Sequence, residues 1–141
     1  MIIYILFCWM LIVPDMAAMA QEDSLSLQKK MNMIDSMTAA IDSKGYRQTE
    51  VIGNDSALAY TGIALKNGEG RLARLSITYK LTKETLLSYF SGGKTIKLVM
   101  REGSFYFFGN EIFDRQGRVR PASSFQKYFR LEKMIRPLFP D

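Results

Sequence analysis

Residues 71–101 read RLARLSITYKLTKETLLSYFSGGKTIKLVMR, and the fold follows from the patterns in this stretch. Between positions 71 and 81, polar and apolar side chains alternate, with Leu75, Ile77 and Tyr79 on the apolar side. A period of two is typical of a strand with one buried and one solvated face, and such strands occur in antiparallel sheets. Residues 71–81 are therefore predicted to form an antiparallel strand.

Two adjacent glycines, Gly92 and Gly93, divide the second half of this stretch. Both can adopt positive φ angles, which a two-residue hairpin turn requires at its central positions. The pattern predicts strands over 85–91 and 94–101, joined by a tight turn. Turn signals downstream delimit two further predicted strands, over residues 104–108 and 111–113.

Upstream of residue 71, the period of the apolar residues changes at Gly45. Before it, residues 24–43 place apolar side chains three or four positions apart, which predicts an amphipathic helix with Ser24 as its N-cap. After it, alternation predicts strands over residues 46–52 and 57–66. The apolar positions of the predicted helix are Leu27, Met31, Ile34, either Met37 or Thr38, and Ile41.

The C-terminal segment allows two interpretations. Residues 114–124 are rich in Arg, Gly, Pro and Ser and predict a long loop. Residues 125–136 could form a basic helix, but YFRLEKMIRPL at 128–138 repeats the pattern of YFSGGKTIKL at 89–98. Because the earlier copy is a predicted hairpin, the repeat favours a strand pair over residues 127–130 and 133–138, and the helix stays open as the alternative.

These elements together predict an α+β fold. An N-terminal amphipathic helix packs on a single, mostly antiparallel β-meander built from repeated hairpins, with roughly six to nine strands in sequential order. Each hairpin is marginal alone and is stabilised by pairing with the next.

The extreme N-terminus has the features of a signal peptide. Residues 2–13 are an unbroken apolar run, shorter than the about 20 residues that a membrane-spanning helix needs. Ala18 and Ala20 form the small-x-small pattern that signal peptidase accepts. We therefore predict cleavage after Ala20, a single exported domain over residues 21–141 in the periplasm or outside the cell, and no membrane span after cleavage.

The composition excludes several kinds of chemistry. The 141 residues include no histidine and one cysteine, Cys8. A His-based triad, a cysteine nucleophile, a zinc site with His or Cys ligands and a structural disulfide therefore lack their residues. The carboxylates nearest one another, Glu102, Glu111 and Asp114, are interpreted as solvated turn acids. We expect no enzymatic activity, no catalytic residue, no metal and no cofactor.

The hairpin motifs carry a resemblance. Tyr89-Phe90-x-x-Gly93-Lys94-x-Ile96, preceded by a helix after a signal peptide, resembles small exported bacterial proteins of unknown function whose hairpins carry YYF-x-NGK-x-I repeats. A more distant likeness is to MORN-variant repeats. In this sequence the last copy has Leu131-Glu132 where the turn glycine would be. The resemblance implies a β-meander with a binding or scaffold role and no catalytic residues.

The C-terminal half is basic and aromatic, which suggests a contact surface. The net charge of +5 would rise by one on loss of Asp15 with the signal peptide, and export would separate the protein from nucleotides and chromosomal DNA. Arginine beside aromatic rings suits an anionic partner, such as an envelope protein or an anionic envelope polymer, and no nucleic acid is expected. The candidate binding residues are Arg101, Phe105, Phe107, Arg115, Arg118, Arg120, Lys127 and Arg130.

A second interpretation concerns the aromatic run over residues 105–108. It could form a central strand with large rings on both faces, or it could line an apolar groove for a lipid, peptide or glycan. The alternative function is a carrier of a small apolar or amphiphilic ligand held between helix and sheet, which would need an apolar pocket of roughly 300 Å³. The oligomeric state, and whether a second copy covers the exposed face of the sheet, stay open.

Overall fold

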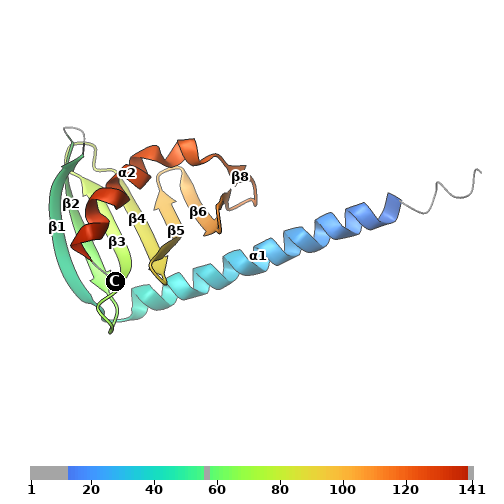
Figure 1. Ribbon diagram of the computed structural model, residues 1–141, viewed down its shortest axis with the longest axis horizontal. Helices are drawn as coiled ribbons and strands as arrows, with labels where there is room; N and C mark the ends of the chain where they lie inside the picture. The colour runs from blue at the N-terminus through green and yellow to red at the C-terminus, as the bar shows by residue number, and fades with distance from the viewer. Residues whose placement is uncertain (1–12, 56–57, 140–141) are drawn as a thin grey trace, which may run out of the picture.

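The computed structural model describes residues 13–55 and 58–139, and within them the predicted helix-plus-meander architecture is confirmed (Figure 1). The strands form one antiparallel sheet in sequential order from β1 to β8. The elements are α1 (Val13–Ser43), β1 (Arg47–Asp55), β2 (Leu58–Lys66), β3 (Leu72–Tyr79), β4 (Thr85–Ser91), β5 (Lys94–Met100), β6 (Gly103–Phe108), β7 (Glu111–Asp114), β8 (Val119–Arg120), a 3₁₀ turn η1 (Ala122–Phe125), α2 (Gln126–Ile135) and a final 3₁₀ turn η2 (Arg136–Leu138).

The hairpin turn between β4 and β5 forms as its glycines predict. Gly92 and Gly93 have φ angles of 56° and 74°, and Ser91 pairs with Lys94 across the turn. Past the turn the register shifts, so that Phe90 lies opposite Thr95 and Tyr89 lies opposite Lys97. This bulge sends Thr95 to one face of the sheet and Lys97 to the other, where each contacts a different helix.

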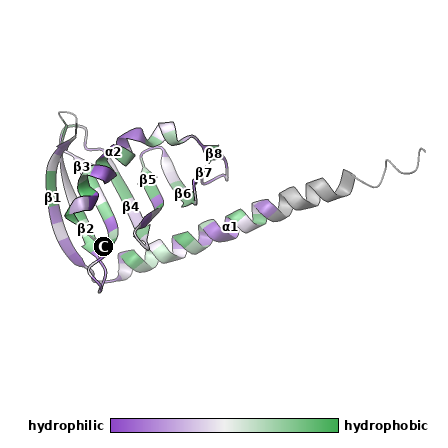
Figure 2. Cartoon of the chain, viewed as in Figure 1, coloured by the Kyte–Doolittle hydropathy of each residue, from purple (hydrophilic) through white to green (hydrophobic). Residues whose placement is uncertain are grey.

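The two faces of the sheet are covered by different helices. The α2 face carries the larger core, in which Tyr128, Leu131 and Ile135 of α2 pack with buried side chains of the strands. The α1 face carries a smaller cluster formed by Met31, Ile34 and Tyr106. Figure 2 shows hydrophilic and hydrophobic residues interleaved along the described part of α1, as expected for a helix with one side on the sheet.

The strand pair favoured for residues 125–138 is wrong, because this segment forms α2 and η2. The positions that would need a hairpin turn are Leu131 and Glu132, which have no glycine to adopt positive φ. Tyr128, Leu131 and Ile135 instead share one side of a helix and are all buried against the sheet. The packing of this apolar side outweighs the sequence repeat.

Helix α1 begins earlier than predicted. It starts at Val13, so Ser24 lies inside the helix and is not its N-cap. The predicted cleavage point after Ala20 falls within α1, whereas residues 2–12 of the apolar run lie outside the described residues. Thr38 is buried and Met37 is exposed, which settles which of the two belongs to the packed side. In the described residues, no helix combines the length and the apolar character needed to cross a membrane.

The segment over residues 114–124 is shorter as a loop than predicted. A turn after Asp114 leads into β8, which pairs with β7, and Pro121 then precedes η1. Asp114 is only 5% exposed, so its interpretation as a solvated turn acid is wrong. Its carboxylate accepts hydrogen bonds from the backbone N–H groups of Gln116 and Arg118, both at 3.0 Å, and so organises the turn.

Candidate functional site

Asp35 is the main polar contact between α1 and the sheet. Its Oδ1 accepts hydrogen bonds from Lys97 Nζ at 2.8 Å and from Tyr106 Oη at 2.9 Å. Its Oδ2 accepts a hydrogen bond from Arg115, which reaches in from the turn after β7. One carboxylate therefore joins α1 to β5, β6 and the β7–β8 turn.

A second aspartate on the same side of α1 repeats this arrangement two turns later. Asp42 Oδ1 accepts a hydrogen bond from Arg74 Nη1 at 2.6 Å, and its Oδ2 accepts one from Tyr89 Oη at 2.8 Å. Both sites combine an aspartate from α1 with a tyrosine and a cation from the strands, and we call them the Asp35 and Asp42 contacts. They fix how α1 lies on the sheet.

The surroundings of these groups change their acidity. Burial by itself would raise the pKa of Asp35, but the hydrogen bonds from Lys97, Arg115 and Tyr106 outweigh it and lower that pKa below its ordinary value. Burial and the hydrogen bond to Asp42 raise the pKa of Tyr89 to about 12. At neutral pH the aspartate is therefore ionised and the tyrosine is protonated, as the hydrogen bonds require.

The structure brings three of the six predicted basic residues together and places the other three elsewhere. Arg115 is directed to α1, where its hydrogen bonds to Asp35 and Tyr106 raise the pKa of its guanidinium. Arg118 Nε instead donates to Asp114 at 2.8 Å, and Arg120 Nη1 lies 3.8 Å from the same carboxylate. Arg118 and Arg120 thus meet around Asp114, whereas the guanidinium of Arg115 turns to Asp35. All three arginines border one hollow of about 240 Å³, which Phe105 also lines.

The other three predicted cations lie elsewhere. Lys127 lies 3.6 Å from Glu84 and has its Nζ 4.1 Å from the centre of the Tyr79 ring. Arg101 is exposed in the turn between β5 and β6, and Arg130 is exposed on α2. Arg101 borders a hollow that Glu84 also lines, so Arg101 and Lys127 approach the same edge of the sheet.

The predicted aromatic residues Phe105 and Phe107 both lie on the α2 face. Phe105 is buried against Phe125, with ring centres 4.9 Å apart. Phe107 is half-buried and meets the ring of Phe129 edge-on, with centres 6.3 Å apart. Tyr106 between them faces α1, so the aromatic run does place large rings on both faces of a strand within the sheet.

A hollow of about 590 Å³ opens beside Phe107 and Phe129, where the β4–β5 and β6–β7 turns approach α2. We call it the aromatic hollow. Lys94 and Arg136 border it, together with polar groups such as Asn110. Arg136 is held by Glu132 at 3.1 Å, and its guanidinium lies over the Phe90 ring at 5.9 Å. Half-buried rings beside two cations are suited to a ligand with an anionic group next to an apolar part.

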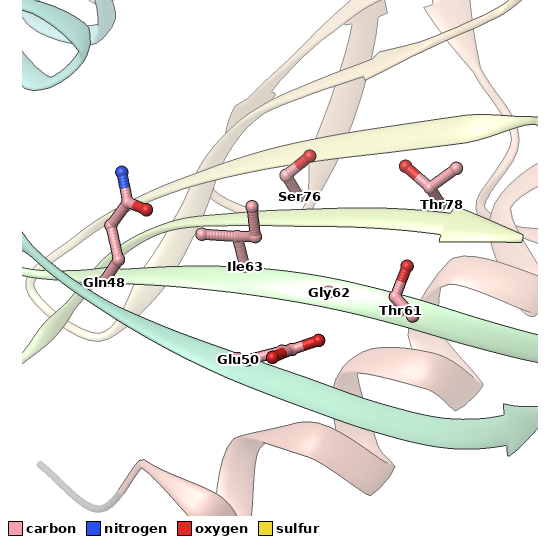
Figure 3. A pocket seen from close by; sticks show the side chains of 7 residues that line it. All are labelled: Gln48, Glu50, Thr61, Gly62, Ile63, Ser76 and Thr78. Atoms are coloured by element: carbon pink, nitrogen blue, oxygen red, sulfur yellow. The ribbon is translucent and has the colours of Figure 1, made fainter.

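A second hollow, of about 530 Å³, lies on the α1 face over β1, β2 and β3 (Figure 3). Thr61, Ser76 and Thr78 present hydroxyl groups there, with Ile63 among them. Glu50 supplies a carboxylate. Most of the lining residues are polar, whereas a carrier of apolar ligands would need a pocket lined mainly by apolar and aromatic side chains.

Comparison of the chain with protein-family models, curated proteins and solved structures found no match. Among the described residues, no three carboxylate, histidine or cysteine side chains gather as a metal site would require. Function is therefore inferred from the residues on the surface of this chain.

The sequence pattern did not identify several residues of these sites. Asp35 and Asp42 are seven positions apart, which places both next to the apolar side of the predicted helix. This spacing could have indicated that both aspartates contact the sheet. Phe129 and Arg136 approach Phe107 only because residues 126–138 are helical. Lys94 follows the Gly92-Gly93 turn, and its position in the sequence does not distinguish a binding residue from an ordinary solvated lysine.

Proposed function

We propose that this chain is an exported, non-enzymatic binding protein of the bacterial cell envelope, and that it contacts an anionic partner through the aromatic hollow. The observation that carries the proposal is the arrangement of Lys94 and Arg136 beside the half-buried rings of Phe107 and Phe129. The partner is an envelope protein or an anionic envelope polymer. The N-terminal apolar run and the Ala18-x-Ala20 pattern support export.

The charges around the hollow support an anionic partner. Lys94 is exposed, and the side chain of Arg136 is 39% exposed, whereas that of Glu132 is 19% exposed and engaged with Arg136. A carboxylate or phosphate entering the hollow would meet one unshielded lysine and one oriented guanidinium. Arginine in such a fixed position favours planar, bidentate recognition of these groups.

The test is site-specific photo-crosslinking in the native host, followed by mass spectrometry of the adduct. A photoreactive residue replaces Asn110, which is exposed at the rim of the hollow, and a matched control replaces Lys80, which is exposed after β3. We expect one dominant envelope component to attach at position 110 and not at position 80. Lys94→Glu should reduce that adduct at least several-fold, whereas Lys80→Glu should leave it unchanged.

Other outcomes would contradict the proposal. Equal labelling from positions 110 and 80 would overturn the assignment to the aromatic hollow. A co-purified lipid with no attached partner would favour the carrier of an apolar or amphiphilic ligand. The same spectra report residues 1–20, and finding them intact on protein in the cytoplasm would overturn export.

A further inference from the structure

The two edges of the sheet are built differently. Strand β1 is nine residues long and pairs with β2 along its whole length without a register shift. Strand β8, at the other edge, has two residues and is followed by Pro121. Within the described residues, no strand pairs with the outer edge of β1 (Figure 1). A long edge strand presents unpaired N–H and C=O groups that can pair with another strand.

Strand β1 lacks most of the features that normally protect an edge. It has no proline and no lysine, and its pairing with β2 shows no bulge. Ile52 is 67% exposed on the α1 face, so its side chain is available to a neighbouring strand. A long, regular edge strand that carries an exposed aliphatic side chain is a template for pairing with another strand.

We propose that β1 pairs antiparallel with β1 of a second copy of this chain, around a twofold axis at Val51. In this register Glu50 lies opposite Ile52 of the second copy, and Gln48 lies opposite its Asn54. The end positions 47 and 55, which face each other, carry opposite charges in the sequence. No charged residue then lies directly opposite a like charge, and all nine residues of each β1 take part.

Two alternative registers are less favourable. An axis at Glu50 would place this carboxylate directly opposite its own copy, which is destabilising. An axis at Ile52 would pair only the positions from 49 to 55 and leave the start of β1 unpaired. The axis at Val51 also places Ile52 diagonal to its own copy, within reach of a branched side chain.

The pairing joins the two sheets and brings together their hollows on the α1 face over β1, β2 and β3. Gln48 and Glu50 line the hollow in Figure 3 from the β1 side, next to the proposed axis. In the pair, Ile52 and Asn54 of the second copy would extend that lining. The pairing involves the opposite end of the sheet from the arginines around Asp114, and it goes beyond the proposed function without depending on it.

The first experiment compares two charged substitutions at one exposed position. Sedimentation equilibrium of the full chain should show a concentration-dependent dimer. Ile52→Glu places two carboxylates directly opposite each other twice in the pair, whereas Ile52→Lys places an ammonium opposite Glu50 twice. We expect Ile52→Glu to weaken dimerisation on the order of tenfold or more relative to Ile52→Lys. Because Ile52 is exposed, both variants should fold, and circular dichroism melting verifies this.

The second experiment reads the register directly. In a Cys8→Ser background, the variant Gln48→Cys/Asn54→Cys should form an inter-chain disulfide on mild oxidation. Within one strand these positions lie about 20 Å apart, so they cannot bridge internally. Each single-cysteine variant is a control. It should crosslink several-fold less, because the same position in the second copy lies at the opposite end of the paired strands.

Several results would overturn the proposal. A chain that stays monomeric at millimolar concentration would do so, as would equal effects of the Glu and Lys substitutions at position 52. Crosslinking of the single-cysteine variants as efficiently as the double variant would exclude this register. Glu50→Gln provides an independent check, because it removes the diagonal repulsion between the two carboxylates and should strengthen dimerisation.

Discussion

Helix α2 buries Tyr128, Leu131 and Ile135 against one face of the sheet, whereas α1 reaches the other face through Met31 and Ile34 plus two aspartates. The α2 face encloses an extensive apolar and aromatic core, while the α1 face relies on directional hydrogen bonds between charged groups. The N-terminal half of α1 extends past the sheet in Figure 1. The two helices therefore differ in how their attachment depends on solution conditions.

The difference shows what each helix contributes. Apolar burial is non-directional and does not depend on the ionisation of side chains, so α2 forms part of the cooperative core. The Asp35 and Asp42 contacts are partly exposed to solvent and depend on ionisation, so α1 is expected to detach locally before the sheet unfolds.

Leu131→Ala should have the largest effect. Leu131 is 2% exposed in the α2 core, and its truncation should lower the free energy of unfolding by about 3 kcal/mol. Chemical denaturation monitored by circular dichroism measures the change. Met134→Ala on the exposed side of the same helix is the matched control and should change it by less than about 0.5 kcal/mol. A similar loss of unfolding free energy from both substitutions would contradict the conclusion that the buried side of α2 forms part of the core.

Asp35→Ala should loosen α1 and leave the sheet folded. The substitution removes three hydrogen bonds and leaves Lys97 and Tyr106 without their shared acceptor. Docking of α1 should weaken by about 2 kcal/mol, seen as faster amide hydrogen exchange in α1 and unchanged exchange in β3 and β4. Asp23→Ala, at an exposed position of the same helix, should leave exchange unchanged. Uniform acceleration across the protein would show that α1 is part of the cooperative core.

Acid should act on α1 before α2. The folded-state pKa of Asp35 lies below its ordinary value of 3.8, so its contribution to stability is present above that value and is lost as the pH falls through the folded pKa. Below about pH 4, NMR signals of Tyr106 and Lys97 should therefore move toward those of the Asp35→Ala variant. Signals of Leu131 should not move in this range. If the NMR signals of both helices changed over the same pH range, the attachment of α1 would not depend on ionisation more than that of α2.

Asp42→Asn should have the smallest effect. The Asp42 side chain is 42% exposed, so loss of its ion pair with Arg74 should cost no more than about 1 kcal/mol. Burial and Asp42 together raise the pKa of Tyr89 to about 12, so the Tyr89 contribution is present below its ordinary pKa of 10.0 and is lost as the pH rises toward 12. The substitution should lower this pKa, as measured by NMR titration. An unchanged Tyr89 pKa would exclude the hydrogen bond.

Local pattern determined most of the fold. The alternation around Leu75 and Ile77 and the positive-φ turn at Gly92-Gly93 predicted antiparallel strands, and the structure confirms them. The spacing of Met31 and Ile34 predicted the helix that packs on the sheet. These features could be predicted because backbone period and turn geometry depend on neighbouring residues alone.

The sites depended on tertiary structure. Residues 128–138 share their pattern with a hairpin, and packing of Tyr128, Leu131 and Ile135 on the sheet selected a helix. That helix brings Phe129 and Arg136 to Phe107 and forms the aromatic hollow. Arg115 was grouped with its neighbours in sequence, yet it bonds to Asp35, 80 positions away. Local sequence specifies period and charge, whereas the partner of each long polar side chain is set by which elements the meander brings together in space.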